Sequence, residues 1–198
     1  MGNQRSIQEK QEHRRRILRS LASTKKALRR DWSALLCDKL SAWISLNRGI
    51  EVIATYAPLD SEADLSALHL SLFGHYQFAY PRVSQRNLSF HLVQDPSELK
   101  KGAFNILEPD PLHHPSVSLG SVDLCLCPGI GFSNNGARLG RGKAYYDSAL
   151  PLLAADTFRM GVAFDLQIRD YLPVESHDVC MTHIATPSGI RPTPGGLS

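Results

Sequence analysis

Five glycines and three cationic residues are concentrated in the segment 129–143. Glycine allows backbone N–H groups to come close to an anion, because it has no side chain in the way. Arg138, Arg141 and Lys143 add full positive charges beside those amides. The residue types and their spacing therefore predict a site that binds phosphate groups.

The residues that follow can serve an aromatic ring and a metal ion. Tyr145 and Tyr146 can stack on a ring system or form the floor of a pocket. Asp147 lies four residues after Lys143, where its carboxylate can hold a metal ion that bridges phosphates. A simpler interpretation is a flexible solvated turn in which Lys143 and Asp147 form an ordinary surface pair. The loop is not a Walker A sequence, because the pattern G-x-x-x-x-G-K-[ST] is absent.

A strand and a helix are predicted on the two sides of this loop. Residues 122–127 form a short apolar run that ends at Pro128, which is typical of a buried strand. Residues 143–153 carry apolar side chains near helical spacing. In this order of strand, glycine loop and helix, the helix N-terminus adds partial positive charge to the loop amides. This is the layout of a phosphate cradle.

The whole chain predicts one α/β domain over residues 1–198. Two N-terminal helices are followed by alternating strands and helices. This order favours an open, mostly parallel sheet with helices on both faces, in a Rossmann-like three-layer arrangement. Ligands in such sheets bind beyond the carboxyl ends of the strands. Helices are predicted at about 7–21, 25–45 and 61–73, strands at 50–57, 76–80, 88–93 and 158–164, and a frayed tail at 190–198.

Charge is distributed unevenly along the chain. Residues 1–30 hold ten Lys or Arg against two Glu, although the net charge of the chain is only +3. Such a basic helix can bind nucleic acid, an anionic membrane or a polyanionic substrate, or it can be a solvated surface helix. One alternative function is therefore a nucleic-acid-binding protein that uses this arm. Another is a sugar-phosphate or CoA-ester enzyme that uses the glycine loop without ATP.

The composition predicts a soluble cytoplasmic protein. Apolar residues make up 42% and charged residues 21% of the 198, and no apolar run is long enough to span a membrane. The first residues are polar and lack the apolar centre of a signal peptide. Cys37, Cys125, Cys127 and Cys180 lack zinc-site spacing and are expected to be small buried residues in a reducing compartment. We expect a monomer with no membrane or nucleic-acid partner.

The sequence PGIGFSNNGARLGRGKAYYD, residues 128–147, resembles the signature of the 5-formyltetrahydrofolate cyclo-ligase family, also called methenyltetrahydrofolate synthetases. That signature has the form P-G-[LIV]-[AG]-F-D-x-x-G-x-R-L-G-[RYH]-G-[KG]-G-Y-Y-D. Ser133 stands where the family has aspartate, and Ala144 stands where it has glycine. We expect Ser133 to weaken a hydrogen bond in the loop, and the Ala144 methyl group to occupy room beside the phosphates.

The resemblance, which covers residues 10–187, implies an enzyme that uses ATP and Mg²⁺. It would convert 5-formyltetrahydrofolate to 5,10-methenyltetrahydrofolate and release ADP and phosphate, by phosphorylation of the formyl oxygen. Arg141 and Lys143 are the implied catalytic residues. Lys10 and Arg14 lie on one helical face and are the implied N-terminal phosphate ligands, with Arg15 or Arg16 as alternatives to Arg14. The other implied ATP-binding residues are Arg138, Leu139, Gly140, Arg141, Gly142, Lys143, Ala144, Tyr145 and Tyr146.

The resemblance also assigns the folate site. Glu62 lies in the family segment Y-x-P-x-x-x-E, and a carboxylate suits the adjacent N–H donors of a reduced pterin. The alternative interpretation is that Asp60, Glu62 and Asp64 only stabilise the first turn of the helix predicted over 61–73. The full set of implied folate-binding residues is Ala57, Glu62, Arg141, Gly142, Lys143, Ala144 and Tyr145.

Two carboxylates are the implied magnesium ligands. Asp178 ends the segment L-P-x-E-x-x-D, whose aspartate helps to hold magnesium in the family. Together with Asp147 it offers the hard oxygen ligands that Mg²⁺ prefers, to be completed by phosphate oxygens and water.

Overall fold

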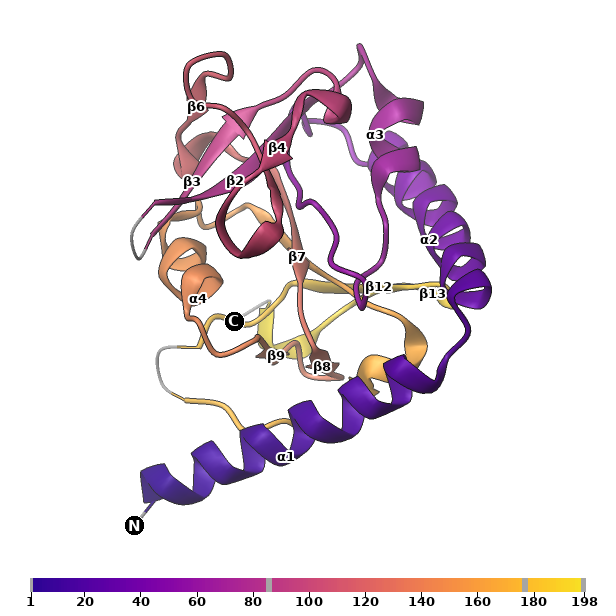
Figure 1. Ribbon diagram of the computed structural model, residues 1–198, viewed down its shortest axis with the longest axis vertical. Coiled ribbons are helices and arrows are strands. Elements are labelled where there is room, and N and C mark those ends of the chain that lie inside the picture. The colour runs from indigo at the N-terminus through magenta and orange to yellow at the C-terminus, as the bar shows by residue number, and fades with distance from the viewer. Residues whose placement is uncertain (1, 85–86, 176–177, 197–198) are drawn as a thin grey trace.

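The computed structural model describes residues 2–84, 87–175 and 178–196, the first few as backbone only (Figure 1). Its centre is an eight-stranded sheet with the order β13-β12-β10-β7-β1-β2-β3-β6. The strands of this sheet are β1 (Val52–Ala54), β2 (Gln77–Ser84), β3 (Asn87–Leu92), β6 (Ser116–Val117), β7 (Leu124–Pro128), β10 (Phe158–Val162), β12 (His183–Thr186) and β13 (Gly189–Pro192). Strands from β12 to β2 are parallel, and β13, β3 and β6 join antiparallel. The predicted mostly parallel α/β sheet is confirmed.

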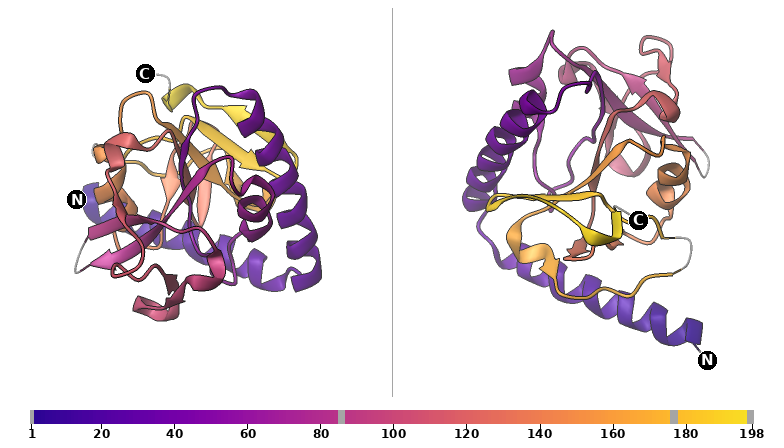
Figure 2. Two further views of the ribbon diagram at one scale, coloured as in Figure 1. Left: turned by 90° about the horizontal axis from the view of Figure 1, so that it is seen from above. Right: turned by 180° about the vertical axis from the view of Figure 1, so that it is seen from behind.

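Helices cover both faces of the sheet (Figures 1 and 2). The α-helices are α1 (Gly2–Ser23), α2 (Lys26–Leu46), α3 (Ser66–Leu72) and α4 (Tyr145–Ala149). One face is covered by α2 and α3, and the short α4 packs on the other face. Short 3₁₀ turns lie at Pro96–Glu98, Ala103–Asn105, Leu119–Ser121, Leu150–Leu152, Asp165–Gln167 and Pro194–Gly196.

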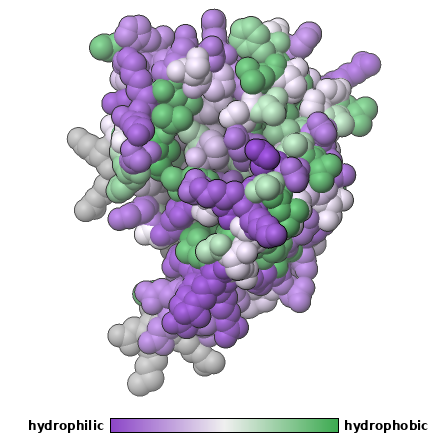
Figure 3. All heavy atoms as spheres, turned by 45° about the vertical axis from the view of Figure 1, so that its right-hand side comes forward, coloured by the Kyte–Doolittle hydropathy of each residue, from purple (hydrophilic) through white to green (hydrophobic). Residues whose placement is uncertain are grey.

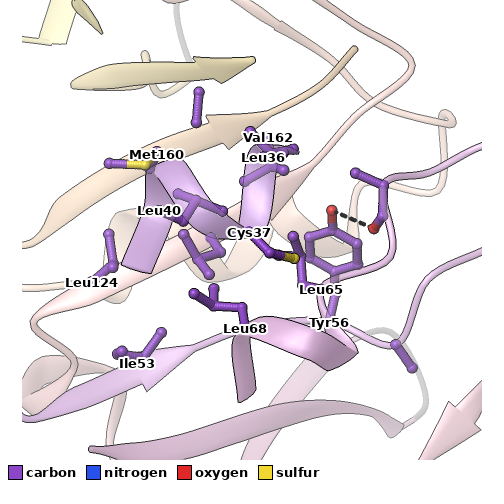
Figure 4. Packing of buried hydrophobic residues seen from close by; sticks show 14 of the residues in the cluster. Leu36, Cys37, Leu40, Ile53, Tyr56, Leu65, Leu68, Leu124, Met160 and Val162 are labelled. Atoms are coloured by element: carbon purple, nitrogen blue, oxygen red, sulfur yellow. Dashed lines mark hydrogen bonds between the residues drawn. The ribbon is translucent and has the colours of Figure 1, made fainter. Parts of the chain in front are cut away.

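The apolar face of α2 fixes that helix on the sheet. Leu36 and Leu40 are fully buried, and they recur at helical spacing. They form one cluster with Ile53 of β1 and Leu68 of α3 (Figure 4). Burial of a leucine side chain is worth about 2 kcal/mol relative to its exposure. The predicted helix over 25–45 is therefore confirmed and has the expected buried face.

The helix α1 is different, because most of its surface is exposed and hydrophilic (lower part of Figure 3). It crosses the end of the molecule where β8 and β9 lie (Figure 1). Ile17 and Leu21 are its fully buried side chains among those described. The Ile17 side chain packs so closely on Gly131 that a β-carbon there would come within 2.6 Å of it. The predicted basic helix therefore exists and is longer than residues 7–21.

Residues 57–65 form an irregular loop, so the prediction of a helix over 61–73 was too long. The helix α3 begins only at Ser66, and its first turn has no acidic residue. Asp64 accepts hydrogen bonds from the backbone N–H and hydroxyl groups of Ser66, which fixes the turn before the helix. The interpretation that Glu62 stabilises a first helical turn was therefore wrong.

The helix after the glycine loop and the C-terminal tail also differ from the predictions. The predicted helix over 143–153 is the five-residue α4, followed by a 3₁₀ turn. A helix this short adds little dipole to the loop. The tail is not frayed over its described part, because β13 pairs with β12 and Thr193 is fully buried. Residues 197–198 lie outside the described part.

Two small sheets complete the fold. One has the order β11-β8-β9, and the other pairs β4 with β5. Their strands are β4 (Lys100–Lys101), β5 (Leu107–Glu108), β8 (Gly131–Ser133), β9 (Arg138–Leu139) and β11 (Ile168–Arg169). The first half of the glycine segment is therefore a β-hairpin, β8–β9, and only residues 140–144 form an irregular loop before α4.

Three of the four cysteines are buried, as predicted, and Cys180 is half-buried. Cys125 and Cys127 face the same side of β7, with their sulfur atoms 3.5 Å apart. Within the described residues, each helix is too short or too polar to span a bilayer.

Candidate active site

A cavity of about 370 Å³ lies beyond the carboxyl ends of β1, β2 and β7. The loop after β1 contributes Ala57 and Glu62 to its wall. The predicted site residues of the glycine segment that line it are Arg138, Gly140, Arg141, Gly142, Lys143, Ala144, Tyr145, Tyr146 and Asp147. The cavity therefore brings together the predicted folate-binding residues and most of the predicted phosphate-binding residues, and it lies where ligands bind in parallel sheets.

Arg141 and Lys143 are the accessible cations at this cavity. The Arg141 guanidinium donates to Glu62 Oε1 at 3.2 Å and to Ser61 Oγ at 2.7 Å. These contacts connect the glycine loop to the loop after β1. The Lys143 ammonium lies 5.6 Å from the centre of the Phe104 ring, in a cation–π arrangement. Lys143 makes no ion pair with Asp147 among the described residues, so the interpretation as a surface pair is not supported.

Arg138 lies underneath the loop, and its side chain is only 6% exposed. Its guanidinium is ion-paired with Asp147, donates to the Pro128 carbonyl at 3.2 Å and lies 5.3 Å from the centre of the Tyr146 ring. A β-carbon at Gly140 would come within 3.0 Å of the same guanidinium. The buried arginine therefore organises the loop from the inside, and glycine at position 140 allows the loop backbone to pack close to it.

Ala144 adopts a left-handed backbone conformation, with φ 58° and ψ 11°. This conformation is unfavourable for a residue with a β-carbon and is readily adopted by glycine. The glycine of the family signature at this position is therefore explained by the backbone turn into α4. We expected the Ala144 methyl group to take room from the phosphates, whereas the structure points to backbone strain.

Ser133 keeps the hydrogen bond that we expected it to weaken. Its Oγ accepts from the backbone N–H of Ala137 at 3.1 Å, and the residue is buried. The backbone of Ser133 also bonds to Ala137 and Gly136 across the β8–β9 turn. Serine therefore supplies the acceptor for this turn without placing a charge there.

Lys10 and Arg14 lie on the inner face of α1, outside the lining of the cavity. The Lys10 ammonium is 3.1 Å from Asp178 Oδ2 and 3.2 Å from Glu175 Oε1. Arg14 Nε donates to the Gly140 carbonyl at 2.8 Å. Burial lowers the pKa of the Arg14 guanidinium, and nearby Asp147 opposes that shift. Arg14 therefore contacts the glycine loop directly, and Lys10 contacts the segment that carries Asp178.

Glu62 is fixed by the loop after β1. Its Oε2 accepts from the Leu59 backbone N–H at 3.0 Å, while Oε1 faces Arg141. The hydroxyl of Tyr56 donates to the Ala63 carbonyl at 3.0 Å, the dashed line in Figure 4, and closes this loop. The carboxylate is therefore held rigidly at the edge of the cavity.

A model of the 5-formyltetrahydrofolate cyclo-ligase family matches residues 6–187. The chain belongs to this family. The match covers both the glycine segment and the loop after β1, which are the two walls that meet at Arg141 and Glu62. The family consists of ligases, and the chain is an enzyme of this class.

Individual cyclo-ligases support the assignment. The 5-formyltetrahydrofolate cyclo-ligase of Mycolicibacterium smegmatis is 32% identical over 157 residues, which cover 76% of this chain and 81% of the relative. That of Escherichia coli K12 is 30% identical over 143 residues, which cover 70% of this chain and 79% of the relative. The NMR structure of the 5,10-methenyltetrahydrofolate synthetase of Aquifex aeolicus superposes with a TM-score of 0.81 at 28% identity. The superposition covers 92% of each chain.

Two carboxylates were predicted to bind magnesium in this cyclo-ligase, and their surroundings differ. Asp147 lines the cavity next to the glycine loop. Asp178 lies outside the lining, where it faces Lys10 and accepts from the Glu175 backbone N–H at 2.8 Å. Within the described residues, no three His, Cys, Asp or Glu side chains form a ready metal site. A metal ion would need phosphate and water oxygens as further ligands, which suits Mg²⁺ bound together with a nucleotide.

Several residues of the cyclo-ligase cavity were missed from the sequence. From the sequence, Phe104 could be a pocket wall or core packing, with core packing favoured. The residue is 60% exposed, and its ring centroid lies 6.2 Å from that of Tyr145. Leu139, predicted to bind ATP, is buried instead and lies outside the lining. The sequence signal that could have located Phe104 at the cavity is the segment GAFNILEP, residues 102–109. This segment resembles a family segment and does not have the alternating pattern of a strand. The other lining residues that were missed are Tyr56, Leu59, Pro81, Val83, Leu88, Ile106, Glu108, Pro128 and Gly129.

Proposed function

We propose that the chain catalyses the cyclisation of 5-formyltetrahydrofolate to 5,10-methenyltetrahydrofolate with ATP and Mg²⁺, and releases ADP and phosphate. The observation that carries this proposal is the contact between Arg141 and Glu62 at 3.2 Å. In this contact a cation of the predicted phosphate site touches a carboxylate of the predicted pterin site, where two walls of the cavity meet. A phosphoryl donor and a reduced folate bound there would have their reacting groups next to each other.

The proposed reaction has two bond-forming steps. The formyl oxygen attacks the γ-phosphorus of ATP, the bond to ADP breaks, and the formyl carbon becomes activated. The nitrogen at position 10 of the folate then attacks that carbon and loses its proton, and the carbon–oxygen bond breaks to release phosphate. The products are methenyltetrahydrofolate, ADP and phosphate. An amide-like oxygen is a poor leaving group, so its phosphorylation is what makes ring closure feasible.

The protein contributes position and charge to these steps. Arg141 and Lys143, both at the accessible surface of the loop, would neutralise the triphosphate and the oxygens of the transferred group. Arg14 holds the Gly140 carbonyl and so fixes the loop amides that would cradle the phosphates. Tyr145 and Phe104, whose rings lie side by side, form an aromatic wall for the folate.

Magnesium would be held by Asp147, and by Asp178 once its carboxylate turns from Lys10 to the metal. When bound, the ion neutralises phosphate charge. Lys10, which lies next to both Asp178 and Glu175, would then serve as a phosphate ligand. Glu62 would accept N–H donors of the pterin beside its contact with Arg141.

The direct test is the rise in absorbance of methenyltetrahydrofolate when the protein is mixed with Mg-ATP and 5-formyltetrahydrofolate. Lys143→Ala should lower kcat/KM by about 100-fold or more, because charge stabilisation of a transferring phosphoryl group is lost. Lys39→Ala, in α2 and outside the cavity lining, is the control and should retain activity. Absence of product with the parent protein would overturn the proposal. A rate of ATP hydrolysis that is the same with and without the folate would indicate a different substrate.

A further inference from the structure

Glu108 is a buried carboxylate in the wall of the cavity. It lies in β5, and the residue is only 5% exposed. The cavity wall on this side is apolar, with Val83, Phe104 and Ile106 as neighbours in the lining. Placing a carboxylate in such surroundings is costly unless it is hydrogen-bonded or paired with a cation.

Glu108 accepts a single hydrogen bond from the described part of the protein. Its Oε1 accepts one hydrogen bond, from the Val83 backbone N–H at 3.3 Å, which is long for a charged acceptor. Within residues 2–84, 87–175 and 178–196, no cation forms an ion pair with it. The other oxygen, Oε2, packs against Gly102, where a β-carbon would lie 2.3 Å away. Glycine at position 102 therefore makes room for the carboxylate without giving it a hydrogen bond.

Glu62, a second carboxylate in the lining, differs in this respect. One of its oxygens faces Arg141 and the other accepts from the Leu59 N–H group, so each oxygen has a partner. A carboxylate can accept about four hydrogen bonds, and Glu108 uses one. Besides Asp147, the lining therefore contains one carboxylate with a protein partner on each oxygen, Glu62, and one on the apolar side with a single protein hydrogen bond, Glu108.

We propose that Glu108 is a specificity-determining residue that accepts hydrogen bonds from N–H groups of the reduced pteridine ring of the substrate. This inference rests on the proposed function. The ring offers an exocyclic amino group and ring N–H groups, more donors than Glu62 has acceptor positions left. Charge-assisted hydrogen bonds in a site that excludes water are strong and directional. The apolar residues that line the cavity around the carboxylate suit the faces of the same ring.

The test is direct binding without ATP, by calorimetry, of two ligands: 5-formyltetrahydrofolate, and 5-formyltetrahydropterin, which lacks the aminobenzoylglutamate tail. Glu108→Gln keeps an oxygen that can accept from the Val83 N–H group, so the fold and the thermal midpoint should be preserved. It should weaken both ligands about tenfold, because a charge-assisted bond is lost and an amide N–H group faces a donor. ADP binding should stay within about twofold of the parent value.

Glu98→Gln is the matched control. This carboxylate lies in the 3₁₀ turn Pro96–Glu98 and contacts His114 outside the cavity, with 53% of its side chain exposed. It should bind both ligands like the parent. Parent-like binding by Glu108→Gln would show that Glu108 only caps the open edge of β2, and a loss confined to the ligand with the tail would place the contact elsewhere. Either result overturns the inference. A parent protein that binds neither ligand would instead contradict the proposed function.

Discussion

Arg138 and Asp147 form an ion pair beneath the glycine loop, with 6% of the arginine side chain and 33% of the aspartate side chain exposed. Three residues further along the sequence, the Arg141 side chain is 38% exposed and faces the cavity. Two arginines that look equivalent in the sequence therefore differ in role. The inner one supports the loop, and the outer one is available to a ligand.

This difference predicts that alanine substitutions of the two arginines affect stability and nucleotide binding differently. Arg138→Ala should lower the free energy of unfolding by about 2 kcal/mol, because it removes one partner of a largely buried pair. Arg141→Ala should cost less than about 1 kcal/mol, because its pair with Glu62 is partly exposed, and it should weaken nucleotide binding. Urea denaturation and ADP titration measure the two effects. A stable Arg138→Ala variant that has lost ADP binding would show that Arg138 is a phosphate ligand.

Ala144→Gly should stabilise the protein. Ala144 holds φ at 58°, and an alanine in this region costs about 1–2 kcal/mol. Glycine removes that strain and loses more chain entropy on folding, so we expect a net gain of about 0.5–1 kcal/mol in unfolding free energy. Ala149→Gly, within α4, should destabilise and is the control. Urea midpoints of both variants check the prediction. A loss of stability at position 144 would contradict it.

Asp147→Asn should raise the magnesium concentration needed for half-maximal activity by about tenfold. The amide is a weaker ligand for a hard cation than a carboxylate is. The comparison is Asp60→Asn, an exposed carboxylate paired with Lys26, for which the magnesium titration should not change. Because Asp147 also holds Arg138, the unfolding free energy of the variant must be measured alongside. An unchanged magnesium titration would remove Asp147 from the metal site.

His69 makes stability depend on pH. Its ring is stacked on Phe78 with the centroids 4.2 Å apart, and its two nitrogens bond to the Tyr80 hydroxyl and the Gln94 carbonyl. Burial lowers its pKa, and the same holds for His183. As the pH falls below about 6.5, these histidines are therefore protonated in the unfolded chain before they are protonated in the folded protein. The free energy of unfolding then decreases until the pH reaches the lower pKa of the folded state.

The measurement is the urea midpoint at about pH 7.5 and pH 5.5. The parent should be less stable at the lower pH, and His69→Gln should show a smaller difference, with His183 supplying the rest. His113→Gln, an exposed histidine, should behave like the parent. An equal pH dependence in the His69 variant would disprove the assignment.

Local patterns predicted the parts of the fold that depend on local burial. The apolar run over 122–127 gave β7, and the spacing of Leu36 and Leu40 gave the buried face of α2. The glycine segment was located for the same reason, because its cations and glycines are adjacent in sequence. These features need no contact between distant residues.

Distant contacts decided the rest. Glu62 lies in a loop because the Tyr56 hydroxyl binds the Ala63 carbonyl, and a helical pattern over 61–73 does not reveal that contact. Pro81 lies within β2, although proline is unusual there, because β1 pairs only with residues 77–79 and leaves this edge open. The inner position of Arg138 depends on Pro128 and Tyr146 together, so residue type alone suggested a phosphate ligand.

The cysteines provide a chemical probe of how the sheet opens. Cys37, Cys125 and Cys127 are sealed inside the native protein, and burial raises the pKa of the Cys37 thiol to about 11, so little reactive thiolate forms. A maleimide reagent should modify Cys180 first. The other three should be labelled more slowly. Their labelling rates would report how often α2 separates from the sheet and β7 from its neighbours, as amide hydrogen exchange does for backbone groups.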